Sequence, residues 1–86
     1  MYYIEKMKTT ILTFGVAKEI FNSASKEMDL KDGITVAELK SSLETAYPEM
    51  KKLHSYLVAI NSEYAGDDQT IHAEDELAII PPVSGG

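Results

Sequence analysis

The most informative segment of this 86-residue sequence reads Thr35-Val36-Ala37-Glu38-Leu39-Lys40-Ser41-Ser42-Leu43-Glu44-Thr45-Ala46-Tyr47-Pro48. Its first four residues match a capping box, in which the Thr35 hydroxyl accepts a hydrogen bond from the Glu38 amide and the Glu38 carboxylate reaches back to the Thr35 N–H. Apolar residues then recur at helical spacing, and Pro48 cannot continue a helix. We therefore expect the main helix at residues 36–47.

Shorter segments rich in apolar and β-branched residues lie on both sides of this helix, and they are typical of strands. We expect strands at residues 9–14, 26–30, 57–60, 63–65 and 77–80. A short helix is expected at 16–21, with Val16, Ala17, Ile20 and Phe21 on one apolar stripe. Turns are expected at Asp32-Gly33 and Asn61-Ser62, a buried apolar side chain at Ile71, and a polar turn at 72–76.

This order of elements predicts an α+β fold of the β-grasp type, in which a mixed sheet packs on one main helix. The length allows one domain, which buries roughly 60% of the surface of its unfolded chain. Side chains alternate between the two faces of a strand. If Ile11 faces the core, Leu12 and Phe14 face outward, and an exposed apolar patch of this kind marks a partner surface.

The charge balance excludes one class of partner. Eight basic residues, all lysine, stand against fourteen acidic ones, which gives a formal net charge of −6. Nucleic-acid binding needs a cationic surface, so we expect no nucleic-acid partner. The acidity favours either a basic protein partner or simply solubility.

The sequence has no cysteine, so it can form no disulfide, no thiolate nucleophile and no cysteine-ligated metal site. This composition fits a reducing compartment. The first residues do not resemble a signal peptide, and the apolar run at 57–60 is far too short to span a membrane. We expect a soluble, cytoplasmic protein without a membrane partner.

No self-contained active site is recognisable. His54 and His72 are distant in sequence, and His72-Ala73-Glu74 fits a solvated polar turn better than a metal site. No serine lies in a nucleophile elbow, and no phosphate-binding loop occurs. The carboxylates at 67–68 and 74–76 lie in polar loops without apolar neighbours. We therefore expect no metal site.

The sequence ends with the segment Ile79-Ile80-Pro81-Pro82-Val83-Ser84-Gly85-Gly86. Proline donates no ladder hydrogen bond, so the sheet must end before Pro81-Pro82, which favour an extended exit. Gly85 and Gly86 lack a Cβ, so this flexible Gly-Gly tail can enter a tunnel too narrow for other residues. The segment is typical of a carboxylate delivered to another protein. The alternative is a frayed or added terminus.

This ending resembles that of the small subunits of molybdopterin synthase, a family of ubiquitin-like sulfur carriers with the β-grasp fold. Two further stretches, 14–19 and 75–80, agree with the family. The resemblance covers residues 7 to 86. It implies an N-terminal extension at 1–6, a β-grasp domain at 7–80 and an extended tail at 81–86.

The resemblance implies that a ubiquitin-activating-type adenylyltransferase uses ATP to adenylate the carboxylate of Gly86, and that sulfur then replaces the adenylate to leave a thiocarboxylate. The large subunit would receive the tail, and the sulfur would pass to cyclic pyranopterin monophosphate. Gly85 would give access to the backbone. The catalytic groups are expected on the large subunit, with no cofactor held permanently by this chain.

The resemblance also implies a docking surface on the outer face of the sheet. It includes Phe14, Tyr64 and Ile80, with Lys18 on the first helix and the tail residues Pro81, Pro82, Val83 and Ser84. Lys18 stands where the family often has arginine, so a bidentate guanidinium contact is absent there. For Tyr64, a place in the core remains an equally good interpretation.

Three alternatives stay open at this point. The chain could be a thiamine-type sulfur carrier, although such carriers typically lack the double proline. It could be a ubiquitin-like protein modifier, linked through Gly86 to a lysine of another protein. It could also be a β-grasp binding module without terminal chemistry.

Overall fold

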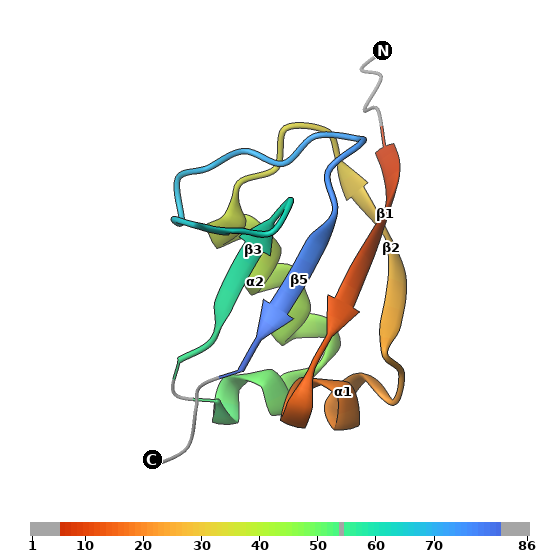
Figure 1. Ribbon diagram of the computed structural model, residues 1–86, viewed down its shortest axis with the longest axis vertical. Helices are drawn as coiled ribbons and strands as arrows, with labels where there is room; N and C mark the ends of the chain where they lie inside the picture. The colour runs from red at the N-terminus through yellow and green to blue at the C-terminus, as the bar shows by residue number, and fades with distance from the viewer. Residues whose placement is uncertain (1–5, 54, 82–86) are drawn as a thin grey trace.

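The computed structural model describes residues 6–53 and 55–81 and shows a five-stranded mixed sheet with one face covered by a helix (Figure 1). Along the chain the elements are β1 (Lys6–Thr13), α1 (Gly15–Phe21), β2 (Ser25–Lys31), α2 (Val36–Ala46), the 3₁₀ helix η1 (Pro48–Lys52), β3 (Leu57–Ile60), β4 (Glu63–Ala65) and β5 (Leu77–Ile80). The predicted α+β fold, with a mixed sheet on one main helix, is confirmed.

The strand order in the sheet is β2-β1-β5-β3-β4. β1 pairs with β2 and β3 pairs with β4, each pair antiparallel and local in sequence. β5 lies between these two hairpins, parallel to β1 and antiparallel to β3, so that Ile79 pairs with Thr13 on one side and with Val58 on the other. The last strand therefore joins the two halves of the sheet.

The core lies between the sheet and α2. The sheet contributes Ile11, Val58, Leu77 and Ile79, which alternate with outward-facing residues, and α2 contributes Leu39 and Leu43. Ile71 is fully buried, as predicted. At the far end of α2, the ring of Tyr47 stacks on that of Phe21 with 4.4 Å between centroids, which attaches α1 to the same core.

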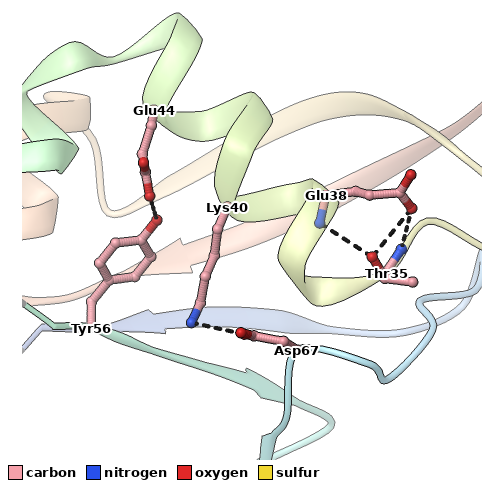
Figure 2. A network of polar contacts seen from close by, with 6 residues as sticks. All are labelled: Thr35, Glu38, Lys40, Glu44, Tyr56 and Asp67. Atoms are coloured by element: carbon pink, nitrogen blue, oxygen red, sulfur yellow. Dashed lines mark hydrogen bonds and ion pairs between the residues drawn. The ribbon is translucent and has the colours of Figure 1, made fainter.

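The N-terminus of α2 is held by the predicted capping box (Figure 2). The Glu38 N–H donates to Thr35 Oγ1 over 3.2 Å, and the Thr35 N–H donates to Glu38 Oε1 over 3.0 Å. Val36 and Ala37, the first two residues of the helix, have no acceptor within the helix for their N–H groups. These groups donate instead to the carbonyls of Gln69 and Asp67. The helix end thus fixes the long loop that leads to β5.

Two side-chain contacts hold α2 against the other half of the chain (Figure 2). The Tyr56 hydroxyl donates to Glu44 Oε2 over 2.7 Å, and Lys40 Nζ lies 3.2 Å from Asp67 Oδ1. Burial, followed by the hydrogen bond to the negative Glu44, raises the pKa of Tyr56 above its usual range. The folded chain therefore favours the neutral phenol.

The hairpin between β3 and β4 turns at Asn61-Ser62, as predicted. Both residues have positive φ, 52° and 70°, as a two-residue type I′ turn requires. Asn22, at the end of α1, also adopts the left-handed conformation, with φ 57°.

No helix in the described part of the chain is long and apolar enough to cross a membrane.

Several expected boundaries are wrong. β1 runs from Lys6 to Thr13 rather than over 9–14, so its first residue is the last one assigned to an N-terminal extension; residues 1–5 lie outside the described residues. Val16 is exposed, because α1 turns Ala17 and Phe21 to the core. The main helix ends at Ala46, with Tyr47 as its C-cap. The helix η1 was not predicted.

Removal of the capping hydroxyl tests the role of the α2 N-terminus. Thr35→Ala should lower the free energy of unfolding by about 1 kcal/mol, because the Glu38 amide loses its acceptor. Denaturant unfolding measures this loss, with the exposed Ser42→Ala in the same helix as the control. Equal stabilities for the two variants would contradict the assignment.

The contact between Tyr56 and Glu44 gives a second stability prediction. Tyr56→Phe should cost about 1 kcal/mol, since a half-buried carboxylate loses its donor. Because the folded-state pKa of Tyr56 is raised, this contribution is complete below the ordinary tyrosine pKa of about 10 and declines as the pH rises above it. Unfolding at pH 7 and pH 11 measures both effects.

Tyr64→Phe is the matched control for this substitution, because Tyr64 is 71% exposed. It should leave stability unchanged at either pH. A difference between wild type and Tyr56→Phe that is constant with pH would disprove the link to phenol ionisation.

Candidate functional site

The face of the sheet opposite α2 carries apolar side chains in register. The ladders align Leu12 of β1 with Ala78 of β5, Ala78 with Ala59 of β3, and Ala59 with Tyr64 of β4. Their neighbours along the strands, Thr13, Ile79, Val58 and Ala65, are buried or partly buried on the α2 side. The row from Leu12 to Tyr64 therefore faces outward.

A second outward-facing row lies two residues further toward the end of β5, beyond the core-facing pair of Ile79 and Val58. Ile80 pairs with Leu57 of β3, and Phe14 directly follows Thr13, whose partner is Ile79. We call the set Leu12, Phe14, Leu57, Tyr64, Ala78 and Ile80 the outer apolar patch. Phe14 and Leu57 are each 48% exposed, and Ile80 is half-buried. Such exposure of contiguous large apolar side chains is typical of a protein–protein interface.

The structure decides the open interpretation of Tyr64. At 71% exposure it does not belong to the core, because the β3–β4 register places it opposite Ala59 on the outer face. Phe14, Tyr64 and Ile80, predicted as docking residues, thus lie on one face. Lys18 is exposed on α1, one helical turn beyond Phe14.

The end of β5 packs against the first turn of α1 (Figure 1). β5 ends at Ile80, as the prolines predict, and Pro81 is half-buried. Gly15 has a φ of +55°, and a Cβ on it would lie 3.2 Å from Cγ of Pro81. The predicted tail residues Pro82, Val83, Ser84, Gly85 and Gly86 lie outside the described residues, as does His54.

The remaining polar groups form turn contacts. The His72 N–H donates to Asp75 Oδ2 over 2.8 Å, which, with a second bond from Asn61, lowers the pKa of the Asp75 carboxyl. His72 Nδ1 lies 3.6 Å from Asp32 Oδ1. Within residues 6–53 and 55–81 there is no pocket and no group of three potential metal ligands. The candidate site in this part of the chain is therefore the outer apolar patch.

Leu57 is the site residue that the sequence prediction missed. The sequence predicts an apolar strand at 57–60 but no docking residue in it, yet Leu57 is 48% exposed. Alternation gave a usable signal, since Val58 and Ile60 face the core and Leu57 must then face outward. The approach of Pro81 to Gly15 had no local signal, because it joins residues from opposite ends of the sequence.

Comparison with known proteins agrees with this geometry. The model of the ThiS family matches residues 11–86. A molybdopterin synthase sulfur carrier subunit from Dictyostelium discoideum is 42% identical over 80 residues, which cover 88% of this chain and 93% of the relative.

Solved structures show the same fold. SAMP1 from Haloferax volcanii, a small archaeal modifier protein, superposes with a TM-score of 0.76 at 27% identity, over 92% of this chain and 99% of that one. In the complex of subunits 1 and 2 of the molybdopterin-converting factor from Helicobacter pylori 26695, one chain superposes with a TM-score of 0.61 at 21% identity, over 93% of this chain and all of that one.

The predicted resemblance to the sulfur carriers of molybdopterin synthase is confirmed by these matches, and the residues matched by the family model include the outer apolar patch and the Gly-Gly ending. The chain belongs to the ThiS family.

Proposed function

We propose that this protein is the sulfur carrier and small subunit of a molybdopterin synthase. The observation that carries the proposal is the position of the outer apolar patch directly beside Pro81, where the chain leaves the sheet toward its Gly85-Gly86 ending. A carrier needs a surface for docking and an end for delivery, and here the docking surface adjoins Pro81, the last described residue before that end. The 42% identity to a sulfur carrier subunit supports the same role.

The chemistry follows from the carboxylate of Gly86. A carboxylate is a poor acyl donor until one oxygen becomes part of a good leaving group. A ubiquitin-activating-type adenylyltransferase uses ATP to form the acyl adenylate and releases pyrophosphate, and a sulfur nucleophile then displaces AMP to leave a thiocarboxylate. The sulfur is donated to cyclic pyranopterin monophosphate. We place this chemistry in the cytoplasm, because a chain without cysteine fits a reducing compartment.

The large subunit of the synthase is the proposed docking partner and supplies the groups that act on the pterin. The solved complex of the two Helicobacter pylori subunits contains a chain of this fold and supports such an assembly. The outer apolar patch supplies the apolar centre that stable interfaces use, and exposed Lys18 lies at its rim.

Protein modification is the second candidate function. It is favoured by the 27% identity to SAMP1, a protein named as a modifier. A modifier uses the same adenylate, but its acceptor is a lysine amine of another protein. The product on Gly86 therefore distinguishes the two functions. The thiamine-type carrier is less favoured because of Pro81-Pro82.

Mass spectrometry of the C-terminal fragment tests the proposal. Cleavage after Lys52 releases residues 53–86, which contain no methionine whose oxidation would imitate the replacement of oxygen by sulfur. After incubation with ATP, a sulfur donor and the activating enzyme, we expect that shift on Gly86. Gly86→Ala should fold normally but lose sulfur transfer, because its Cβ obstructs a narrow channel.

Two other outcomes are informative. A lysine-linked remnant of residues 53–86 on a second protein would support the modifier. If the fragment stays unmodified, and deletion of Gly85-Gly86 does not impair the protein's function, the chain is a binding module without terminal chemistry.

The docking role of the outer apolar patch gives a separate prediction. Phe14→Ala should weaken binding to the large subunit by more than about 1 kcal/mol, while the free energy of unfolding changes by less than about 0.5 kcal/mol. Titration calorimetry and thermal unfolding measure the two quantities. Ser42→Ala, exposed on the opposite face, is the control. A large loss of stability in Phe14→Ala would instead assign this side chain to the core.

A further inference from the structure

The contact between Gly15 and Pro81 joins the first turn of α1 to the start of the tail. Gly15 adopts a φ of +55°, a conformation that side chains disfavour, and its open side faces the Pro81 ring. A Cβ there would lie 3.2 Å from Pro81 Cγ, closer than an ordinary van der Waals contact. A side chain at residue 15 would therefore require Pro81 to shift, by a few tenths of an ångström for a Cβ alone.

Both partners in this contact are held by the rest of the fold. On one side, Ala17 and Phe21 anchor α1 in the core, and the Ala17 N–H donates to the Phe14 carbonyl over 3.1 Å. On the other side, the pairing of Ile79 with Thr13 fixes the end of β5 two residues before Pro81. Gly15 is thus fixed by the core, and the chain is fixed by the sheet up to Ile80, the residue before Pro81.

We propose that Gly15 is a positioning residue for sulfur delivery: its missing side chain lets Pro81 rest against α1, and this contact sets the position of Pro81, from which the chain continues to its reactive end. The inference rests on the proposed carrier function. The ring of Pro81 restricts its φ, and the sequence continues with a second proline. The two fixed φ angles reduce the number of bonds that can rotate to compensate for a displaced Pro81.

The consequence for transfer is geometric. A displacement of about 1 Å at a reacting atom can cost a hundredfold in rate, even when its cause lies far from the chemistry. A side chain at position 15 displaces the start of the tail, so it slows sulfur transfer without removing a group that touches the pterin. Its effect should grow with the size of the side chain.

The test compares Gly15→Val with Gly33→Val. Gly33 also has a positive φ, +86°, but no atom lies within 4 Å of the position of its Cβ. Both variants therefore place a side chain on a residue with positive φ, which strains the backbone. Only in Gly15→Val does the new side chain contact Pro81. The measurement is single-turnover sulfur transfer from the thiocarboxylate form to cyclic pyranopterin monophosphate at saturating large subunit, together with the dissociation constant of the complex.

We expect Gly15→Val to slow the single turnover about tenfold while the dissociation constant changes less than about twofold, and Gly33→Val to change neither. Gly15→Ala, which requires only a small shift of Pro81, should fall between wild type and Gly15→Val, and it also serves if the valine variant does not fold. Equal rates for Gly15→Val and Gly33→Val would overturn the proposal.

A double-mutant cycle shows whether Pro81 mediates the effect. Pro81→Ala removes the ring that the new side chain would meet, so in this background Gly15→Val should slow transfer less than twofold. The same tenfold loss in both backgrounds would assign Gly15 a role other than the placement of Pro81.

A readout on the free chain separates this inference from the proposed function. The amide NMR shifts of Ser84, Gly85 and Gly86 should change in Gly15→Val and stay unchanged in Gly33→Val, whether or not the wild type accepts sulfur. A wild type that never receives sulfur would refute the carrier function alone. Identical tail shifts in the two variants would refute the role of Gly15.

Discussion

The parallel pairing of β1 with β5 is the constraint on which the other features of this protein depend. It sets the first and the last described strand side by side in the middle of the sheet and joins two hairpins that otherwise share no ladder. Because the two strands run in the same direction, the residues that follow them also meet. Phe14 and Gly15 on one side thus come next to Ile80 and Pro81 on the other.

The two faces of the sheet have different roles. Alternate residues of β1, β3 and β5 bury themselves against α2 and supply the hydrophobic stabilisation of a small domain. Their neighbours carry an apolar surface that the fold does not cover. The amides at the N-terminus of α2 bind the loop before β5, whereas Glu44 near its C-terminus accepts a hydrogen bond from Tyr56, directly before β3. The helix is thus attached to the segments that precede two neighbouring strands of the sheet.

Local signals predicted most of this structure. The capping box, the turn at Asn61-Ser62, the outward direction of Phe14 and the end of the sheet at the prolines each depend on a few neighbouring residues. The predictions that failed depend on tertiary context. Val16 is exposed because the side of α1 that packs on the core is the one that carries Ala17 and Phe21. Leu57 is exposed, although it is apolar, because its neighbour Val58 faces the core and alternate residues of a strand face opposite sides. The contact of Gly15 with Pro81 depends on β1–β5 pairing, which no local pattern encodes.

The orientation of the central strands also determines how the molecule bears a mechanical load. β1 enters the sheet at the end where β5 begins, and β5 finishes beside α1 (Figure 1). A partner that draws the chain away beyond Pro81 pulls β5 along its own axis, so the ladder bonds to β1 and β3 are loaded together in shear rather than opened one by one. A sheet loaded in this way resists extraction, so the domain stays folded under a pull that is applied beyond Pro81.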